Sequence, residues 1–400
     1  MEIKYVTTTC PYCGAGCTFN LVVKDGKISG VQPCQRGPVN EGKLCPKGIF
    51  GWEFIVSEDR LKTPLIKDKA TGEFKPATWD EALTVIAENF KKYSPEEIAV
   101  ISSARCCNED NYAMQKFARI VLKTPNVDHC ARLCHAPTVA GLNMVFGSGA
   151  STNSFDDLAI ADFVFIIGSN NFEAHPLAGR RIMQAKEKGA HILVCDPRVT
   201  PTAKQADLHI QHYPGTDIQL LNCLMKQIIE RGWVDEEFVK NRTNGYEELK
   251  ACVTQDKYSI ENTSVVCGVP AEKIEQALEW LHECQHKTAF VHCLGITQHT
   301  VGVDNVRSIA FVQTLLGNIG KPGCGVNALR GQNNVQGSCD MGALPNVYAG
   351  YLKVTDPEAA KKVAAYWGID EIPNGKLGLH IPEMLETFEE HPDKLKCLYL

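Results

Sequence analysis

Cys10-Pro11-Tyr12-Cys13-Gly14-Ala15-Gly16-Cys17 is the most informative stretch of this sequence. It holds three thiols, and a fourth follows in Gly42-Lys43-Leu44-Cys45-Pro46-Lys47-Gly48. A cubane iron–sulfur cluster needs one thiolate for each corner iron, and small residues between the cysteines let the backbone curl around the cube. The spacing therefore predicts a 4Fe-4S cluster, and with it a two-electron redox enzyme, on Cys10, Cys13, Cys17 and Cys45.

Structural zinc is the main alternative for this cysteine set. Zinc ribbons usually bring two Cys-x-x-Cys knuckles, whereas this sequence has one knuckle followed by Cys17 and a lone Cys45. Disulfides are less favoured, because the chain starts Met1-Glu2-Ile3-Lys4 without an apolar signal segment or a twin arginine. We therefore expect a reducing, cytoplasmic location.

The bulk composition narrows the class of protein. A single core stops growing beyond roughly 250–300 residues, so the 400 residues predict two or three domains. The net charge of −6 gives no reason to expect nucleic acid or an anionic membrane as partner. The longest apolar runs are of strand length, far below the roughly 20 residues that a membrane span needs.

Thiols are unusually frequent, since the chain has 18 cysteines. A cytosolic chain this rich in cysteine usually spends some of them on metals. Most of the others are expected to be small core hydrophobes, among them Cys195, Cys223, Cys252 and Cys293.

A strand–loop–helix–strand unit is predicted over 161–197. An apolar strand over 161–167 leads into the turn at Gly168, a basic helix covers 177–188, and a second strand at 191–195 ends at Asp196. This is the parallel βαβ unit of a doubly wound domain, in which ligands bind beyond the carboxyl ends of the strands. The turn lacks Gly-x-Gly-x-x-Gly, so the nicotinamide fingerprint is absent.

A second unit repeats this arrangement further along the chain. A strand over 288–293 is followed by an exit loop that contains Gly295 and Gln298, and then by a helix over 303–316. Between the two units, Gly215-Thr216-Asp217 stands at the head of a helix that starts at residue 218. Such a step can bind an amide or phosphate edge, although alone it is only an N-cap.

The candidate reaction centre is Cys134-His135. The pair lies between a short strand near Val127 and a helix starting at Pro137, where a helix N-terminus favours thiolate and His135 could exchange protons near neutral pH. A buried core cysteine beside a helix-capping histidine is the other interpretation. A polar loop, Arg330-Gly331-Gln332-Asn333-Asn334, is positioned to return over the same crevice.

Taken together, these motifs resemble the molybdenum/tungsten bis-pterin guanine dinucleotide oxidoreductases, and within them most closely the catalytic α subunit of archaeal, deazaflavin-linked formate dehydrogenases. The similarity covers essentially all 400 residues, and the motifs occur in family order. The resemblance implies one 4Fe-4S cluster, a Mo- or W-bis(molybdopterin guanine dinucleotide) cofactor, and reversible oxidation of formate to CO2. It also implies a partner β subunit, an iron–sulfur flavoprotein that reduces the deazaflavin coenzyme F-420.

The resemblance assigns roles to residues at matching positions. Lys47 would bridge cluster and pterin, Cys134 would ligate Mo or W, and His135 and Arg330 would handle formate. The predicted contacts of the dinucleotide cofactor are Gly168, Ser169, Asn170, Asp196, Arg198, Gly215, Asp217, Gly295, Gln298 and Gln332.

The expected fold is α/β, with a 4Fe-4S β domain at 1–60 and two Rossmann-like domains. The first is discontinuous (61–129 plus 331–400) and the second covers 130–330. Family α subunits continue into a C-terminal β-barrel, which we expect to be absent from this sequence.

Three other functions are weighed. Formylmethanofuran dehydrogenase has a similar catalytic subunit, with a separate chain closing the site. A non-catalytic electron-transfer subunit would keep the cluster but lose Cys134, His135 and Arg330. Periplasmic nitrate reductase is disfavoured by His135 and by the lack of an export signal.

Overall fold

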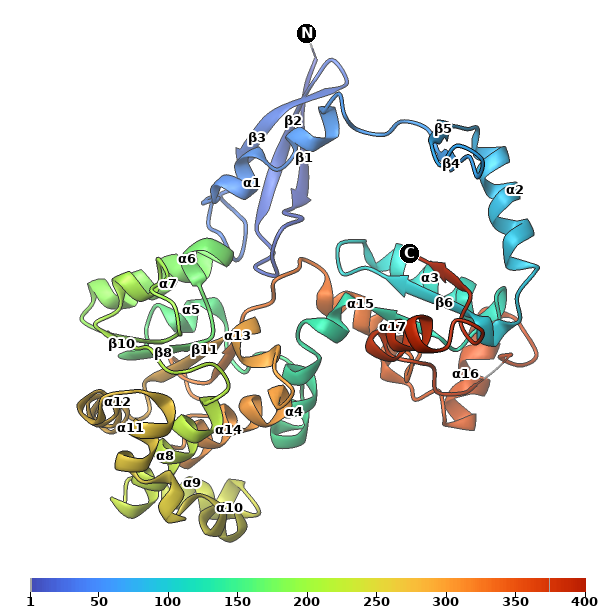
Figure 1. Ribbon diagram of the computed structural model, residues 1–400. Helices are drawn as coiled ribbons and strands as arrows, with labels where there is room; N and C mark the ends of the chain where they lie inside the picture. Colours follow the sequence, from blue (N-terminus) through green and yellow to red (C-terminus); the bar gives the residue numbers. More distant parts are fainter. Residues whose placement is uncertain (1, 374) are drawn as a thin grey trace.

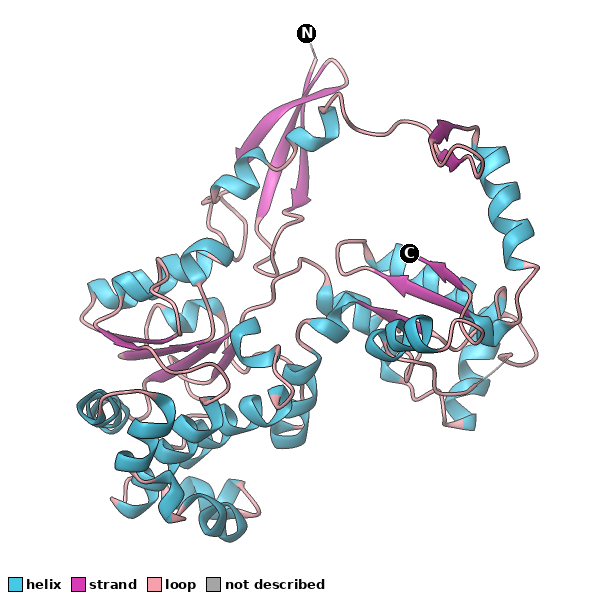
Figure 2. Cartoon of the chain, in the orientation of Figure 1, coloured by secondary structure: helices cyan, strands magenta, loops and turns pink. Residues whose placement is uncertain are grey.

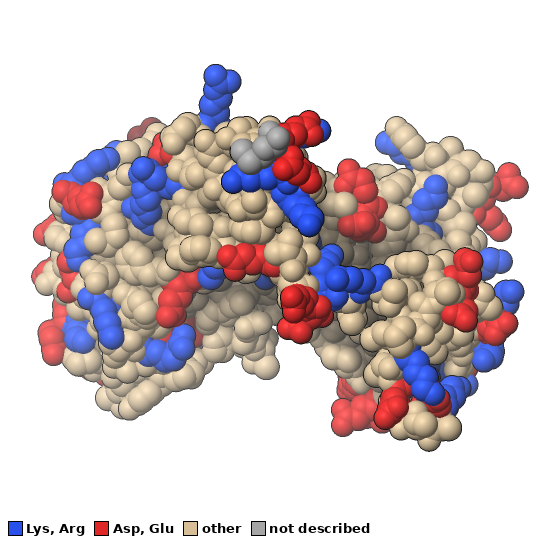
Figure 3. Space-filling model, turned by 90° about the horizontal axis from the view of Figure 1, so that it is seen from above, with Lys and Arg blue, Asp and Glu red and all other residues tan. Residues whose placement is uncertain are grey.

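The computed structural model describes residues 2–373 and 375–400, which form an α/β protein of several parts. An N-terminal three-stranded sheet, a five-stranded sheet and a second three-stranded sheet each occupy a separate region, as Figure 1 and Figure 2 show. The predicted α/β class is thereby confirmed. Seen from above, the molecule is hollowed between its two larger parts, and Figure 3 shows positive and negative side chains interspersed on that face.

The N-terminal sheet presents the cysteine run. Strands β1 (Ile3–Thr9), β2 (Thr18–Lys24) and β3 (Lys27–Pro33) are antiparallel in the order β1-β2-β3. The run from Cys10 to Cys17 is the connection between β1 and β2, and a hairpin turn joins β2 to β3. Helix α1 (Pro46–Phe50) starts directly after Cys45, with proline in its first turn where no backbone donor is lost.

The five-stranded sheet is fully parallel, in the order β10-β9-β8-β11-β12. Alternate side chains of β8 enter two different cores. Phe163, Phe165 and Ile167 pack with α8, α12 and α14, while Val164 and Ile166 pack with α5 and α7. Helices therefore cover both faces, as in a doubly wound sheet. The bounds are β8 Phe163–Ile167, β9 His191–Cys195, β10 Leu208–Ile210, β11 Thr288–His292, β12 Val326–Ala328, α5 Phe155–Leu158, α7 Pro176–Glu187, α8 Asp217–Glu230, α12 Ala271–Glu283 and α14 Gly302–Leu315.

The chain reverses its direction of travel across this sheet between β8 and β11. From β8 it moves outward through β9 and β10, and it then returns to β11 and β12 on the other side. The two exit loops that follow β8 and β11 therefore diverge at a topological switch point, which is where open α/β sheets bind their ligands. The strands and helices predicted around 161–197 and 288–316 are confirmed with shifts of two residues or fewer.

The second three-stranded sheet joins distant parts of the chain. Its order is β13-β6-β7, all parallel, from β6 (Ile98–Ser102), β7 (Val127–His129) and β13 (Cys397–Tyr399). Helix α3 (Asn108–Ile120) lies on one face and α17 (Ile381–Glu390) on the other. The predicted boundaries at 60, 130 and 330 stay a prediction, although this pairing of residues 98–129 with the end of the chain supports a discontinuous domain.

A helix and a hairpin lie between these sheets and stand apart from them in Figure 1. The hairpin is β4 (Leu65–Lys67) with β5 (Phe74–Pro76), and α2 spans Trp79–Phe90. Thr78 caps α2 and forms a capping box with Glu81.

The remaining elements are shorter or lie at the periphery. The helices are α4 Ala136–Phe146, α6 Asn171–Ala174, α9 Glu236–Arg242, α10 Tyr246–Val253, α11 Ile260–Cys267, α13 Leu294–Thr297, α15 Val335–Asp340 and α16 Pro357–Trp367. The 3-10 helices are Glu53–Val56, Pro95–Glu97, Cys130–Leu133, Ala203–Gln205, Asp256–Tyr258 and Ala349–Tyr351. Among the described residues, no helix is long and apolar enough to cross a membrane.

One cysteine was predicted in the wrong environment. Cys252 is exposed, whereas Cys195 and Cys223 are fully buried in the core of the five-stranded sheet and Cys293 is also buried. Cys252 lies on α10, a short amphipathic helix whose buried face carries Val253 instead. Neighbouring positions on a helix point about 100° apart, so an apolar local sequence did not guarantee burial.

Candidate active site

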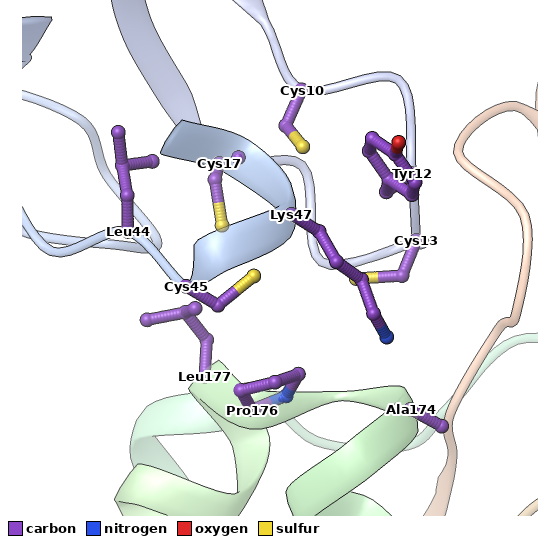
Figure 4. A pocket seen from close by; sticks show the side chains of 11 residues that line it. Cys10, Tyr12, Cys13, Cys17, Leu44, Cys45, Lys47, Ala174, Pro176 and Leu177 are labelled. Carbon is purple, nitrogen blue, oxygen red and sulfur yellow. The ribbon is translucent and has the colours of Figure 1, made fainter. Parts of the chain in front are cut away.

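Four cysteines from two loops line one small pocket. Cys10, Cys13 and Cys17 come from the β1–β2 connection and Cys45 from the residue before α1, and Figure 4 shows their sulfurs around a common space. The same pocket is lined by Lys47 and, from the five-stranded unit, by Pro176 and Leu177. The predicted set is thus brought together, although the cysteines are separated in sequence.

Cys10, Cys13 and Cys17 resist ionisation on their own. Burial raises the pKa of Cys10 and Cys13, and it raises that of Cys17 to about 12, with the neighbouring thiols adding to the effect in each case. A cationic group in the middle would offset both causes, since metal-bound thiols lose their proton outright. The donor set therefore fits a metal cluster.

In the described part of the chain, no group of three or more Cys, His, Asp or Glu converges on one point as the ligands of a single metal ion would.

Lys47 connects the cluster pocket with the five-stranded unit. Its Nζ donates to the carbonyl oxygen of Glu173 at 2.5 Å, across 126 residues of sequence. Glu173 belongs to α6, in the exit loop of β8, which is the loop of Gly168. The lysine therefore links the cysteine pocket to the loop at the switch point of the sheet.

The cluster loop also touches residue 330 directly. Gly14 N donates to the carbonyl oxygen of Arg330 at 2.9 Å, and His175 Nε2 donates to the same oxygen at 2.7 Å. A side chain at position 14 would have no room, since its Cβ would lie 2.6 Å from Arg330 Cβ. The glycine in the middle of the cysteine run is thus the point where the cluster loop and the Arg330 loop meet.

Arg330 lies close to both Cys134 and His135. Arg330 and His135 line one cavity of about 390 Å³, together with Cys339, Asp340 and Tyr351. Burial raises the pKa of Cys134 to about 11, while the charge of Arg330 and a hydrogen bond from the Gly331 backbone act in the opposite direction. The guanidinium is itself buried, and its Nη2 donates to the carbonyl of Gly149 at 2.7 Å.

The expectation of a thiolate at Cys134 needs correcting. The helix that follows, α4, starts at Ala136, but burial outweighs its N-terminus and keeps the thiol protonated in the absence of a cation. His135 differs from expectation too. Burial and the adjacent Arg330 lower its pKa to about 2, so it is neutral rather than poised near pH 7.

The predicted dinucleotide contacts lie at the carboxyl edge of the five-stranded sheet. Gly168 follows β8, Asp196 follows β9, and Gly295 and Gln298 follow β11. Gly168 has φ +60°, and a Cβ on it would lie 2.6 Å from the backbone of Gly295. The two glycines let the exit loops pass each other at the switch point.

Several of these side chains have partners within the protein. Asp196 accepts from the Arg198 backbone at 2.8 Å, and buried Asp217 accepts from His212 at 3.0 Å. Asn170 accepts from Thr202 at 2.9 Å, and Ser169 donates to Asn171 at 2.5 Å.

The two predicted glutamines form hydrogen bonds with residues near Cys134, whereas Gly215 and Arg198 are exposed. Gln298 donates to the Leu133 carbonyl at 2.8 Å, and Gln332 accepts from Cys130 at 3.4 Å. Gly215 (φ +86°) and Arg198 lie at the exposed edge of the same sheet.

Some site residues were not predicted from the sequence. Thr138, His292 and Leu329 surround His135, and Tyr351 lines the Arg330 cavity with an unusual positive φ of 61°. His292 could have been found, since it stands at the carboxyl end of a predicted strand. Tyr351 follows an irregular segment without periodicity, which gave no such signal.

Two models of known protein families match this chain. The molybdopterin oxidoreductase Fe4S4 domain matches residues 3–57, and the molybdopterin oxidoreductase family matches residues 60–400. The chain belongs to the molybdopterin oxidoreductase family. The predicted resemblance is confirmed, and the two matches indicate a 4Fe-4S cluster and a Mo- or W-molybdopterin cofactor.

Named relatives are similar over the whole chain. It is 54% identical over 400 residues to the F420-dependent formate dehydrogenase 1 subunit alpha of Methanococcus maripaludis and 52% identical over 400 residues to its counterpart in Methanocaldococcus jannaschii, spanning 58% of each relative. It is 44% identical to formate dehydrogenase H of Escherichia coli, covering 96% of this chain and 54% of that protein. The chain thus spans little more than half the length of these relatives.

A solved structure shares the fold. Acetylene hydratase from Pelobacter acetylenicus superposes with a TM-score of 0.67 at 24% identity, over 80% of this chain and 44% of that one. At this identity the match supports the fold alone.

Proposed function

We propose that this chain is the catalytic part of a formate dehydrogenase, which oxidises formate reversibly to CO2 and passes electrons through one 4Fe-4S cluster to a partner. The observation that carries the proposal is that His135 and Arg330 line one cavity, that Arg330 lies close enough to Cys134 to act on its thiol, and that the cluster loop is hydrogen-bonded to residue 330. The relatives named as formate dehydrogenases support the choice of substrate.

Formate must be recognised by charge. It has too little apolar area for burial to hold it, so charge-assisted hydrogen bonds of about 1.5–3 kcal/mol each have to supply the affinity. A guanidinium fork matches two carboxylate oxygens. Arg330 is the buried guanidinium of the cavity that His135 also lines, so it is the group proposed to bind and orient formate.

Oxidation of HCOO⁻ to CO2 releases one proton and two electrons. Cys134 would hold the metal of the pterin cofactor, which would supply the two-electron acceptor. Cys10, Cys13, Cys17 and Cys45 would hold the cluster that relays the electrons singly, and Lys47 would stand on the path between the two groups. His135 can accept a proton at Nδ1 only when the hydroxyl of Thr138, which faces that nitrogen at 3.0 Å, turns away.

The cofactor's nucleotide ends are proposed to lie along the carboxyl edge of the five-stranded sheet. This placement rests on the switch point between β8 and β11 and on the close approach of Gly168 and Gly295. The remaining predicted contacts are Ser169, Asn170, Asp196, Arg198, Gly215, Asp217, Gln298 and Gln332.

The electron partner is proposed to be a β subunit, an iron–sulfur flavoprotein that reduces coenzyme F-420. The names of the methanogen relatives support this choice. The cytoplasmic location stays a prediction.

Arg330→Lys in the complete, cofactor-loaded protein tests the proposal. A lysine keeps the charge but loses one of two carboxylate bonds, which should lower kcat/KM for formate by about tenfold to a hundredfold in a dye-reduction assay. Arg231→Lys is the matched control, because Arg231 also makes a bidentate pair, with Glu275 at 2.8 Å, remote from the site. Near-normal kinetics of Arg330→Lys would refute the role.

Formylmethanofuran oxidation is the second candidate, because its chemistry on a formyl carbon is similar. The native complex should be assayed with formate and with formylmethanofuran in parallel. Activity with formylmethanofuran alone would replace the proposal. Iron without Mo or W in protein from its native host would instead favour a non-catalytic electron-transfer subunit.

A further inference from the structure

His135 is the end of a buried chain of hydrogen bonds. Its Nδ1 lies 3.0 Å from Thr138 Oγ1, which in turn lies 3.2 Å from Nε2 of His292. On the other side of the ring, His135 Nε2 lies 3.0 Å from the carbonyl oxygen of Leu329. His135, Thr138 and His292 are all fully buried, so water does not compete for these bonds.

The directions of these bonds follow from chemistry. A carbonyl oxygen only accepts, so Nε2 of the neutral His135 ring must carry the proton. Nδ1 is then an acceptor and takes the Thr138 hydroxyl proton. The hydroxyl oxygen accepts in turn from Nε2–H of His292, whose Nδ1 has no partner in the described structure. Each group in the chain therefore has one defined proton position.

This chain of hydrogen bonds connects three segments that contribute residues to the site. Thr138 lies on α4, directly after the Cys134 loop, while His292 ends β11 and Leu329 precedes Arg330. The Leu329 carbonyl also accepts from Cys293 Sγ at 3.0 Å, and Thr297 Oγ1 donates to the Cys134 carbonyl at 2.8 Å. The relative placement of Cys134 and Arg330 thus depends on the bonds of His135 and Leu329, together with the bond of Thr297 to the Cys134 carbonyl.

We propose that Thr138 and His292 are positioning residues that hold His135 as its Nε2–H tautomer, with that proton donated to the Leu329 carbonyl, and so fix Arg330 relative to Cys134. The catalytic importance of this arrangement rests on the proposed function, whereas the tautomer itself does not. Neither residue touches the substrate cavity, whose lining includes His135 and Arg330 but not Thr138 or His292.

Substitutions at Thr138 separate the hydroxyl from the volume of the side chain. Thr138→Val keeps the shape and removes the hydroxyl, and Thr138→Ser keeps the hydroxyl. Thr263→Val is the matched control, because Thr263 is equally buried and its hydroxyl accepts from Gln219 at 2.9 Å, far from the site.

The complete, cofactor-loaded enzyme should respond in kcat. We expect Thr138→Val to lower kcat about tenfold, the effect of losing about one hydrogen bond. KM for formate should stay within about twofold of the native value, because the Arg330 guanidinium can still bind both carboxylate oxygens. Thr138→Ser should restore kcat to near the native value, and Thr263→Val should leave it unchanged. A native kcat in Thr138→Val, or equal losses in the Val and Ser variants, would overturn the positioning role.

A second measurement needs no turnover. Long-range proton–nitrogen correlation spectra of the ¹⁵N-histidine-labelled native enzyme should show His135 as the Nε2–H tautomer, and Thr138→Val should change the Nδ1 shift from hydrogen-bonded to free. An Nδ1–H tautomer in the native enzyme would overturn the inference. If the enzyme does not oxidise formate at all, the proposed function fails, and this spectrum still decides the tautomer.

Discussion

Gly14→Ala is the sharpest perturbation that the structure offers. Gly14 N donates to the Arg330 carbonyl, and a methyl group at position 14 would lie 2.6 Å from Arg330 Cβ and 2.9 Å from its carbonyl oxygen. Carbon atoms in contact normally lie about 3.5–4.0 Å apart, so the two loops must separate by roughly 1 Å. The atoms in the way are at or near the backbone and cannot swing aside.

Two consequences of different size are expected. Forcing a methyl group into a packed position costs about 1–3 kcal/mol of folding stability. Moving Arg330 by roughly 1 Å should reduce formate turnover by up to about a hundredfold, because a binding group promotes the reaction only when it holds the substrate in the reactive geometry. Thermal unfolding and formate-dependent dye reduction on the complete enzyme measure the two effects, with iron content as a check on loading.

Gly30→Ala is the matched control for this experiment. Gly30 belongs to the same N-terminal sheet, and a Cβ there would meet nothing within 4 Å. The reasoning is wrong if Gly14→Ala is as stable and as active as Gly30→Ala.

Two further predictions concern the cluster and acid stability. Cys45→Ser should reduce the iron content and abolish the electron paramagnetic resonance signal of the cluster. Cys252→Ser, which changes an exposed thiol, should keep both. A full iron content in Cys45→Ser would contradict the assignment of Cys45 as a ligand. Burial lowers the pKa of His129 to about 4. Its contribution to the free energy of unfolding is therefore complete above the pKa of the unfolded state, near 6.5, and is lost as the pH falls towards 4. The loss of unfolding free energy is about 2 kcal/mol at pH 5. Urea midpoints at pH 7 and pH 5 should differ less in His129→Gln than in the native protein, and an unchanged difference would show that His129 is not responsible.

Much of the fold could be predicted because its signals are local. The apolar run before Gly168 and the Gly-bounded helix after it define a parallel unit in sequence alone, and α2 follows from Thr78 and the pattern behind it. The spacing of the four N-terminal cysteines likewise predicted that they line one pocket. These features depend on periodicity and turn chemistry, which need no knowledge of distant residues.

The details of the site could not be predicted because they depend on burial and on contacts between distant segments. The local sequence suggested an ionised Cys134 and a titrating His135, and only the packed structure shows that burial reverses both expectations. The contact of Gly14 with Arg330 and the role of Thr138 beside His292 have no local signature at all.

The bond between the cluster loop and residue 330 has a consequence for the order of assembly during synthesis. All four cluster cysteines have been made once residue 45 is complete, whereas Arg330, whose carbonyl accepts from Gly14 in the cluster loop, is added much later. Contacts between such distant segments form late, after the loops between them have closed. The cluster loop is therefore complete in sequence before the residue that anchors it has been made, so its final position can be fixed only late in folding.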